Sequence, residues 1–180
     1  MNNNENKTFI NEKIHKSLSN WDINKYLDNK CNLILYYKLK KYKTIKEVLG
    51  QYNKCVILYQ NGRGSGHWTC LYKIDNKKDT IYFFDSYGLM IDKEFIFITK
   101  NIKRELGIDY NYLSKLLYDS KLKVEFNEYQ LQTYKSGYNT CGRWVMFRLK
   151  NNNLSVKEFY KLFRGFKNKD LIITLLTIKI

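Results

Sequence analysis

The residue Cys141 combines several features that favour thiol chemistry. It follows the polar residues 138–140, which include side chains that cap helices, and it begins an apolar helical segment. A thiol at a helix N-terminus lies at the positive end of the helix dipole, beside free backbone N–H groups, and both favour the thiolate. Gly142, the next residue, leaves room for a substrate or another backbone segment. The alternative is a small cysteine that simply packs at a helix start.

His67 is one of only two histidines, and it begins a β-rich segment behind a glycine-rich loop. The β-rich segments on either side of residues 75–79 predict an antiparallel hairpin. If Ile74 pairs with Thr80, Asp85 becomes the diagonal neighbour of His67 on the same face of the sheet. There its carboxylate can accept a hydrogen bond from the imidazole and fix the tautomer. A register shifted by one residue would place Asp85 on the opposite face, as an ordinary aspartate at the end of a strand.

Gln132 lies in the polar loop that precedes Cys141. Its amide group could donate to a developing oxyanion beside the backbone N–H of the cysteine, and one such donor lowers a barrier by about 2.7–4 kcal/mol. The alternative is a solvated loop glutamine. The two residues are nine positions apart, so residues 135–139 must bulge if the amide is to reach the thiol, and Gln130 is farther still.

A sheet and several helices are needed to position these side chains, and the hydrophobic pattern predicts both. Strands are expected at 55–59, 67–74, 80–85 and 121–126, and helices at 21–27, after 44–47, over 92–107, from 141 and after 155–158. The run 171–178 fits a helix or a strand, and a buried helix is the interpretation adopted. Residues 62–66 are expected to form a flexible lip above the site, and the first dozen residues to be loose. The prediction is an α+β fold with a central, mostly antiparallel sheet flanked by helices, and Cys141 at the N-terminus of a core helix.

Length and composition favour one domain over residues 1–180. A chain of 180 residues with 44% hydrophobic residues can bury a core, which excludes wholesale disorder, and no linker or repeat marks a boundary. The net charge of +15 suits an acidic partner such as DNA, an anionic membrane or an acidic protein. An A/T-rich coding sequence, which supplies Lys, Asn, Ile and Tyr codons and few Pro codons, is the alternative source of the lysines.

The cysteines indicate a reducing compartment. They are spaced irregularly and without a CxxC pair: Cys31, Cys55, Cys70 and Cys141. This excludes a disulfide framework and, with only two histidines, argues against a zinc site, so the first three are expected in the core or in strands. Residues 1–13 lack the apolar stretch of a secretory signal, and the apolar run 171–180 is about half a membrane span. We therefore expect a soluble protein that is neither secreted nor membrane-spanning.

Four short segments, taken in order, resemble one family of enzymes. They are Gly-His-Trp at 66–68, Phe-Asp-Ser at 84–86, Leu-Gln at 131–132 and Thr-Cys-Gly at 140–142. The order His, Asp, Gln, Cys, with Trp after the His and Gly after the Cys, resembles the adenain-like cysteine proteases. That clan includes the adenovirus maturation protease and the proteases specific for ubiquitin-like proteins. The resemblance covers about residues 53–150.

The resemblance implies a role for each of these residues. Cys141 corresponds to the nucleophile, His67 to the general base and then acid, and Asp85 to the residue that orients the imidazole. Gln132 corresponds to the oxyanion donor, although its separation from the cysteine is a few positions longer than usual in the family.

Three further residues are expected beside the site: Gly66, Trp68 and Gly142. Trp68 is expected to pack there rather than react. The resemblance implies no metal and no cofactor. DNA is the activator and partner that the basic charge suggests, since a protease held on packaged DNA could reach its substrates by sliding.

The resemblance also implies a substrate and a setting. Members of the clan cleave after small residues, often at Gly-x sites. The TCGRW stretch at 140–144 resembles relatives in large DNA viruses, so we expect a viral member, of a virophage or a related element. It would act as a monomer on capsid or core precursors during virion maturation, in the virion and the host cytoplasm (the virus factory), without a membrane partner.

Two alternatives remain open. A deubiquitinating or SUMO-removing enzyme would keep the chemistry and act on host conjugates. A basic nucleic-acid-binding module without catalysis would make the order of the four segments a coincidence. Selective labelling of one cysteine by a thiol reagent would separate the second alternative from both enzymes.

Overall fold

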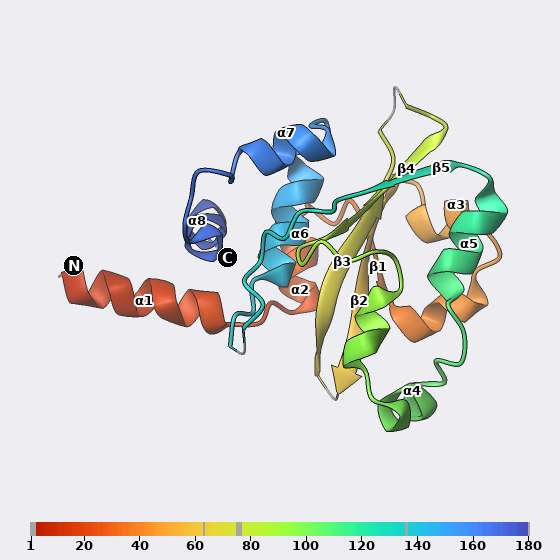
Figure 1. Cartoon of the computed structure of the whole chain (residues 1–180), viewed down its shortest axis with the longest axis horizontal. Coiled ribbons are helices and arrows are strands. Elements are labelled where there is room, and N and C mark those ends of the chain that lie inside the picture. The colour runs from red at the N-terminus through yellow and green to blue at the C-terminus, as the bar shows by residue number, and fades with distance from the viewer. Residues whose placement is uncertain (1–2, 63, 75–76, 136, 180) are drawn as a thin grey trace.

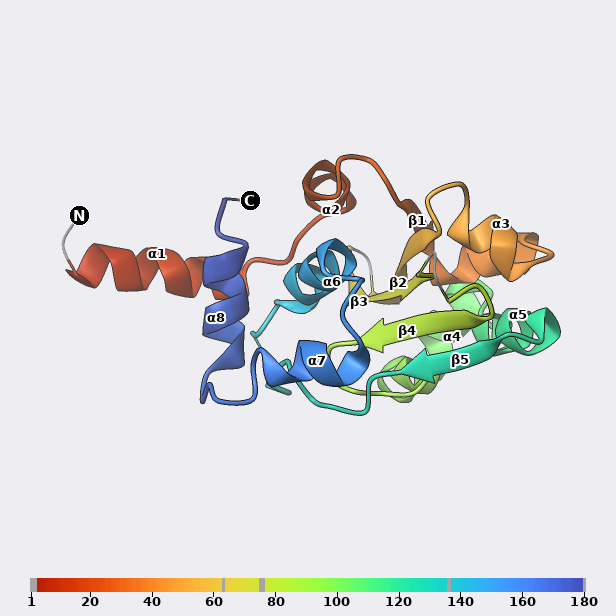
Figure 2. The ribbon, with the colours of Figure 1, turned by 90° about the horizontal axis from the view of Figure 1, so that it is seen from above.

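One five-stranded sheet organises the protein. The structure is a computed structural model and describes residues 3–62, 64–74, 77–135 and 137–179. The strands follow the chain in spatial order: β1 (Asn32–Leu35), β2 (Lys54–Gly62), β3 (Ser65–Tyr72), β4 (Thr80–Asp85) and β5 (Lys123–Phe126). Helices cover both faces of this sheet, and the expected α+β class is confirmed (Figure 1 and Figure 2).

The sheet is mixed, with antiparallel pairing only at its centre. β2, β3 and β4 form the expected antiparallel meander, whereas β1 pairs with β2, and β5 with β4, in parallel. Parallel neighbours require a crossover, and helical segments supply one between β1 and β2 and another between β4 and β5. Within the meander Thr69 pairs with Asp85, which is the register expected from pairing Ile74 with Thr80.

Two sets of helices form the outer layers (Figure 1). One set consists of α1 (Asn3–His15), α2 (Asn20–Tyr26), α6 (Cys141–Lys150), α7 (Val156–Lys161) and α8 (Lys169–Leu176). The other consists of η1 (Tyr36–Lys41), α3 (Ile45–Leu49), η2 (Lys93–Phe97), α4 (Lys100–Leu106) and α5 (Tyr112–Ser120), where η marks a 3-10 helix. Each set closes its own hydrophobic core against the sheet. Among the described residues, no helix is long and apolar enough to span a lipid bilayer.

Alternation along β3 assigns its residues to these two cores. Trp68 and Cys70 lie in the core with α6, whereas Leu71 lies in the core with α5. His67 has the parity of Leu71, so its side chain starts on the α5 side of the sheet. The pairing of β3 with β4 ends at Thr69. Groups from the two faces can therefore meet just beyond that end of the sheet.

The single helix expected over residues 92–107 is wrong, because the segment forms η2 and α4 instead. Asp92 adopts a left-handed backbone conformation, with φ 62°, and its side chain makes no cap bond to η2. Its Oδ2 instead accepts a 3.0 Å hydrogen bond from the Ser114 backbone N–H in the first turn of α5. Its carboxylate accepts a 2.9 Å hydrogen bond from the Tyr59 hydroxyl, which holds it in the core. Thr99 caps α4, and Gly107 ends that helix with φ 65°, as expected.

Other differences lie where the local pattern is weak. The first dozen residues, which were expected to be loose, include a helix that begins at Asn3 and contacts α8. In the segment expected to form a lip at 62–66, Gly62 pairs with Ser65, and residue 63 lies outside the described residues. β1, η1 and α5 have no counterpart among the expected elements. The capped starts of α3 and α7 and the terminal helix α8 are confirmed.

Candidate active site

The imidazole of His67 lies against the carboxylate of Asp85. Its Nε2 is 3.2 Å from Oδ1 of Asp85, and the same oxygen accepts a 2.7 Å hydrogen bond from the Tyr87 backbone N–H. The Asn127 side chain accepts from the backbone N–H of Asp85 and donates to its carbonyl, at 2.9 and 2.6 Å. The Tyr87 ring stacks on the imidazole, with centroids 4.5 Å apart. Nδ1 of His67 is therefore the ring nitrogen that remains for a second partner.

Cys141 supplies a thiol at the same pocket as His67. It is the first residue of α6, is 8% exposed, and lines with His67 a pocket of about 320 Å³. Burial lowers the pKa of His67, but the charge and hydrogen bond of Asp85 raise it, and so do the hydrogen bond and charge of Cys141. The net pKa of the imidazole lies well above its usual value. Asp85 therefore stabilises the protonated, positively charged form of the imidazole.

Gln132 lines the same pocket despite its separation from Cys141 along the chain. Its buried side chain accepts a 2.7 Å hydrogen bond from the Ser86 hydroxyl. Its Nε2 donates to the Tyr138 carbonyl at 2.9 Å and to the Tyr87 hydroxyl at 3.2 Å. The loop between Gln132 and α6 includes Gly137 with φ 90°, a conformation that side chains disfavour. The extra residues are thus taken up by a turn, which keeps the amide at the pocket.

Asp170, on α8, ties together the two ends of this loop. Its buried carboxylate accepts hydrogen bonds from the Thr133 backbone N–H at 2.7 Å, from the Thr140 hydroxyl, and from Trp144 Nε1 at 3.2 Å. Thr133 follows Gln132 and Thr140 precedes the cysteine, so one carboxylate holds both neighbours. Sequence reasoning missed Asp170, because an acidic residue in the first turn of a helix is common for the helix alone.

Glu94, on η2, is a second residue that sequence reasoning missed. Its side chain is only 4% exposed, and its Oε1 lies 3.8 Å from Nε2 of His67. In the helix expected over 92–107, Glu94 would be a first-turn acid facing water. No local signal distinguishes it from such a residue, because its burial depends on how η2 packs against the sheet at β2.

A comparison with known proteins places the chain in a viral family. No family model matches it. The "Uncharacterized protein V9" of Sputnik virophage is 40% identical over 145 residues, which cover 81% of this chain and 82% of that protein. This chain belongs to the family of that virophage protein. The expected relationship to a virophage is therefore confirmed.

One solved structure shares the fold of this virophage-family protein at low sequence identity, and a second is similar to it more weakly. The selenomethionine form of a protease of ASFV has a TM-score of 0.50 and 15% identity, over 91% of this chain and 67% of that one. The SUMO protease Ulp1 has a TM-score of 0.39 and 18% identity, over 88% of this chain and 74% of that one. This chain spans about two thirds of the ASFV protease. The likeness to that protease is one of fold.

Of the three residues expected beside the site, Gly66, Trp68 and Gly142, only Gly66 lines the pocket. A Cβ on Gly66 would collide with the Tyr59 carbonyl. Trp68 packs in the core, and its Nε1 donates to the Leu18 carbonyl at 3.1 Å. A Cβ on Gly142 would lie 3.2 Å from Leu18 Cβ and 3.3 Å from Trp68 Cδ1. The glycine therefore lets the start of α6 approach β3.

The remaining cysteines lie in the core, as expected. Burial raises the pKa of Cys31 to about 11, and it raises the pKa values of Cys55 and Cys70 well above the usual range. Cys31 is 8% exposed, the same fraction as Cys141, and its thiol donates to Asn24 Oδ1 at 3.7 Å. Exposure alone therefore does not distinguish these two thiols, and their polar neighbours do.

One group of described residues is compact enough to be tested for a metal. A nitrogen of His67 and oxygens of Asp85 and Glu94 lie within 4.8 Å of one another. Nε2 of His67 and Oδ1 of Asp85 already share a hydrogen bond at 3.2 Å, so these atoms have a role without an ion. We assign no metal to them, and the absence of a metal cofactor stays a prediction.

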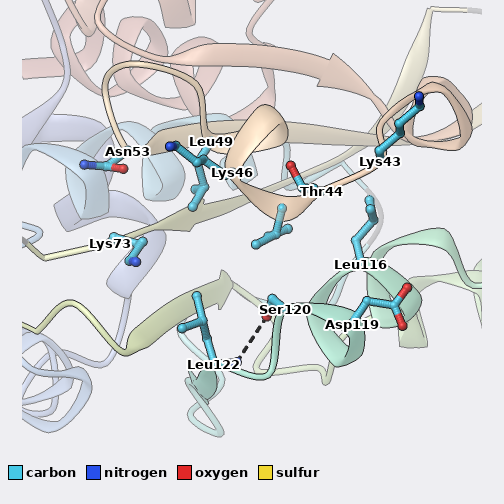
Figure 3. Close-up of a pocket in the computed structure, with 11 residues that line it drawn as sticks. Lys43, Thr44, Lys46, Leu49, Asn53, Lys73, Leu116, Asp119, Ser120 and Leu122 are labelled. Atoms are coloured by element: carbon cyan, nitrogen blue, oxygen red, sulfur yellow. Dashed lines mark hydrogen bonds between the residues drawn. The ribbon is translucent and has the colours of Figure 1, made fainter.

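A second hollow, of about 370 Å³, lies away from the thiol, between α3 and the end of α5 (Figure 3). Its polar rim includes Lys43, Lys46 and Lys73, and Leu116 and Leu122 form part of its apolar wall. None of the described residues that line it is a histidine or a cysteine. A thiol and an imidazole therefore occur together at the pocket of His67 and Cys141 and not at this hollow.

Proposed function

We propose that this protein is a cysteine endopeptidase whose catalytic triad is Cys141, His67 and Asp85. The observation that carries the proposal is the convergence of a thiol at a helix start and the imidazole of His67 at one pocket, with the buried carboxylate of Asp85 hydrogen-bonded to that imidazole. These groups come from α6, β3 and β4, and separately each has an ordinary structural explanation. Together they match the arrangement that thiol proteases require.

In the proposed acylation step, the Cys141 thiolate attacks the carbonyl carbon of a peptide bond. The π electrons move to the carbonyl oxygen, and the imidazolium of His67 gives its proton to the leaving amine as the C–N bond breaks. A water molecule then attacks the thioester, with His67 taking its proton, and the thiolate leaves. Asp85 keeps the imidazole oriented throughout through its 3.2 Å contact with Nε2.

In the same proposal, Gln132 and the backbone N–H of Cys141 stabilise the oxyanion. Both hydrogens of the Gln132 amide are now used, by the Tyr138 carbonyl at 2.9 Å and the Tyr87 hydroxyl at 3.2 Å. The longer bond, to Tyr87, is the one we expect to yield to the oxyanion. Tyr87 can keep its place without it, because its ring remains stacked on the imidazole of His67.

We further propose that the substrate is a capsid or core precursor, cleaved after small residues at Gly-x sites during virion maturation. Membership in the family of a virophage protein and the fold shared with a protease of ASFV support this setting. An aromatic wall would contact the substrate, since Phe97 and Tyr134 line the pocket with ring centroids 5.2 Å apart. Tyr134 is 58% exposed, which leaves its ring available to an incoming chain.

DNA is the partner we propose for the basic surface. The net charge of +15 supports it, since a protein that neutralises phosphates releases counterions and binds less tightly as salt rises. Binding of duplex DNA should weaken steeply between low and physiological salt, and cleavage should accelerate when DNA is added. Negligible binding at low salt would remove this part of the proposal.

Selective labelling by a peptide vinyl sulfone tests the chemistry. We expect one adduct, at Cys141, that Cys141→Ala abolishes, together with all hydrolysis above background. Cys31→Ala is the matched control, because that thiol is equally exposed and lacks an imidazole partner. Its labelling and activity should equal those of the wild type. Full hydrolysis by the Cys141→Ala protein would exclude this nucleophile.

A second experiment identifies the substrate. Candidate capsid proteins are co-expressed with wild-type or Cys141→Ala protein and their new termini are read by mass spectrometry. We expect new termini after small residues only with the intact thiol. A fluorogenic ubiquitin and SUMO panel is run in parallel, and rapid release there with intact capsid proteins would favour a host conjugate instead.

A further inference from the structure

Glu94 touches the site but has no part in the triad. Its side chain is 4% exposed and lines the pocket that contains Cys141. It approaches His67 on the same nitrogen as Asp85, with Oε1 at 3.8 Å from Nε2 against 3.2 Å for Asp85 Oδ1. Two carboxyl groups therefore face one edge of the imidazole.

One oxygen of each carboxyl group is buried without a hydrogen-bond partner among the described residues. These atoms are Oδ2 of Asp85 and Oε1 of Glu94. Oδ1 of Asp85 is already satisfied by His67 and by the Tyr87 backbone N–H. Two carboxylates can only accept hydrogen bonds, so in their ionised forms they would leave both atoms unsatisfied at a high cost. A proton on one carboxyl group turns it into a donor for the other.

We propose that Glu94 is a protonated carboxylic acid that donates a hydrogen bond to Oδ2 of Asp85 and so positions this carboxylate on His67. Glu94 is then a positioning residue, and this role rests on the proposed function. The site holds one positive imidazolium and one negative carboxylate, with Glu94 neutral. Its ionisation would place a second anion beside the first in a buried setting, which is unfavourable.

The groups that face Glu94 support the neutral form. Burial raises the pKa of Glu94; the charge of His67 lowers it, the charge and hydrogen bond of Asp85 raise it, and the result is about 8. Tyr87, which follows β4, and Cys141, on α6, line the same pocket as Glu94. Burial, followed by the charges of Cys141, Glu94 and Asp85, raises the pKa of the Tyr87 phenol, so this group also stays neutral.

The first test compares Glu94→Gln with Glu94→Ala. Glutamine keeps a donor and cannot ionise, whereas alanine leaves Asp85 Oδ2 without a partner. Alkylation of Cys141 by iodoacetamide is followed by mass spectrometry between about pH 5.5 and 9. Near pH 7 we expect Glu94→Ala to react about tenfold slower than wild type and Glu94→Gln to recover most of that loss. The wild-type profile should show an inflection near pH 8 that Glu94→Gln lacks.

Several outcomes would overturn the inference. If Glu94→Gln reacts as slowly as Glu94→Ala, the charge of Glu94 is required and the neutral acid is wrong. Equal rates for both variants and wild type would mean that Glu94 positions nothing. A changed wild-type profile on adding EDTA would assign the pair to a bound cation. Equal alkylation of Cys141 and Cys31 in the wild type would instead count against the proposed function. The second test, below, does not depend on that function.

The second test measures the free energy of unfolding against pH. The folded protein keeps a proton on Glu94 up to about pH 8, whereas the unfolded chain releases it near the ordinary glutamate pKa of about 4.3. Wild-type stability should therefore fall as pH rises through this window, and fall less in Glu94→Gln. Glu105→Gln, an exposed position on α4, is the matched control and should follow the wild type. Equal pH slopes for wild type and Glu94→Gln would show that Glu94 is ionised when folded.

Discussion

A residue with a hydroxyl side chain precedes both α6 and α7, but the two hydroxyl groups make different hydrogen bonds. Ser155 caps α7 in a complete capping box, in which its hydroxyl accepts from the Glu158 N–H and Glu158 accepts in return. Thr140, at the same position before α6, makes no cap bond. Its hydroxyl donates to the buried carboxylate of Asp170 instead. Cys141 follows it as the first residue of α6.

The difference shows how a helix start becomes available for chemistry. A cap uses the first N–H groups of the helix, which stabilises the helix but removes those donors from any ligand. At α6 the threonine is turned away, so no side-chain cap occupies the donors next to Cys141. The cost in helix stability is offset by Asp170, which links the threonine to Trp144 and to the loop after Gln132.

Of the changes near these two helix starts, removing the Asp170 carboxylate should have the largest effect on stability and on the reactivity of Cys141. Asp170→Ala leaves the Thr140 hydroxyl and Trp144 Nε1, both on buried residues, without their acceptor, and each such loss costs about 1–3 kcal/mol. We expect a lower denaturation midpoint and a rate of Cys141 alkylation reduced by about tenfold or more under conditions where the variant is folded. Asp170→Asn keeps one acceptor oxygen, so its stability and alkylation rate should lie between those of the wild type and Asp170→Ala. Unchanged alkylation in folded Asp170→Ala would separate the carboxylate from the site.

Changing Thr140 should have a smaller effect at the same helix. Thr140→Val keeps the shape but loses the donor to Asp170, at a cost of about 1 kcal/mol or somewhat more. Thr140→Ser keeps the donor and should restore both stability and the alkylation rate. Denaturant titration and alkylation kinetics are measured on the three proteins together. If the serine variant behaves like the valine variant, the methyl group rather than the hydroxyl bond is what matters.

The smallest effect on the site is expected at α7. Ser155→Ala removes an ordinary cap and should lower the free energy of unfolding by about 1 kcal/mol, measured by urea titration. Cys141 alkylation should keep the wild-type rate, since α7 contributes no residue to the pocket. A slower alkylation of Cys141 in Ser155→Ala would contradict this, because it would show that the cap of α7 affects the reactivity of the thiol at the start of α6.

Local sequence patterns predicted much of the secondary structure and the central hairpin. The β-rich segments around the turn expected at 75–79, of which 75 and 76 lie outside the described residues, predicted the hairpin, and pairing Ile74 with Thr80 gives the observed register that brings Asp85 beside His67. The polar loop before an apolar run predicted that a helix begins at Cys141. The outer strands β1 and β5 pair in parallel through crossovers, and neither pairing has a local signal that fixes it.

The sequence by itself determined the order of the chemical groups, the central hairpin and the helix start that bears the thiol, because each depends on neighbours a few positions away. The tertiary structure decided which groups share the site. Glu94 and Asp170 look like exposed first-turn acids along the chain, yet both are buried against partners far from them in sequence. Burial and long-range hydrogen bonds change what a carboxyl group does, and neither can be deduced from its neighbours along the chain.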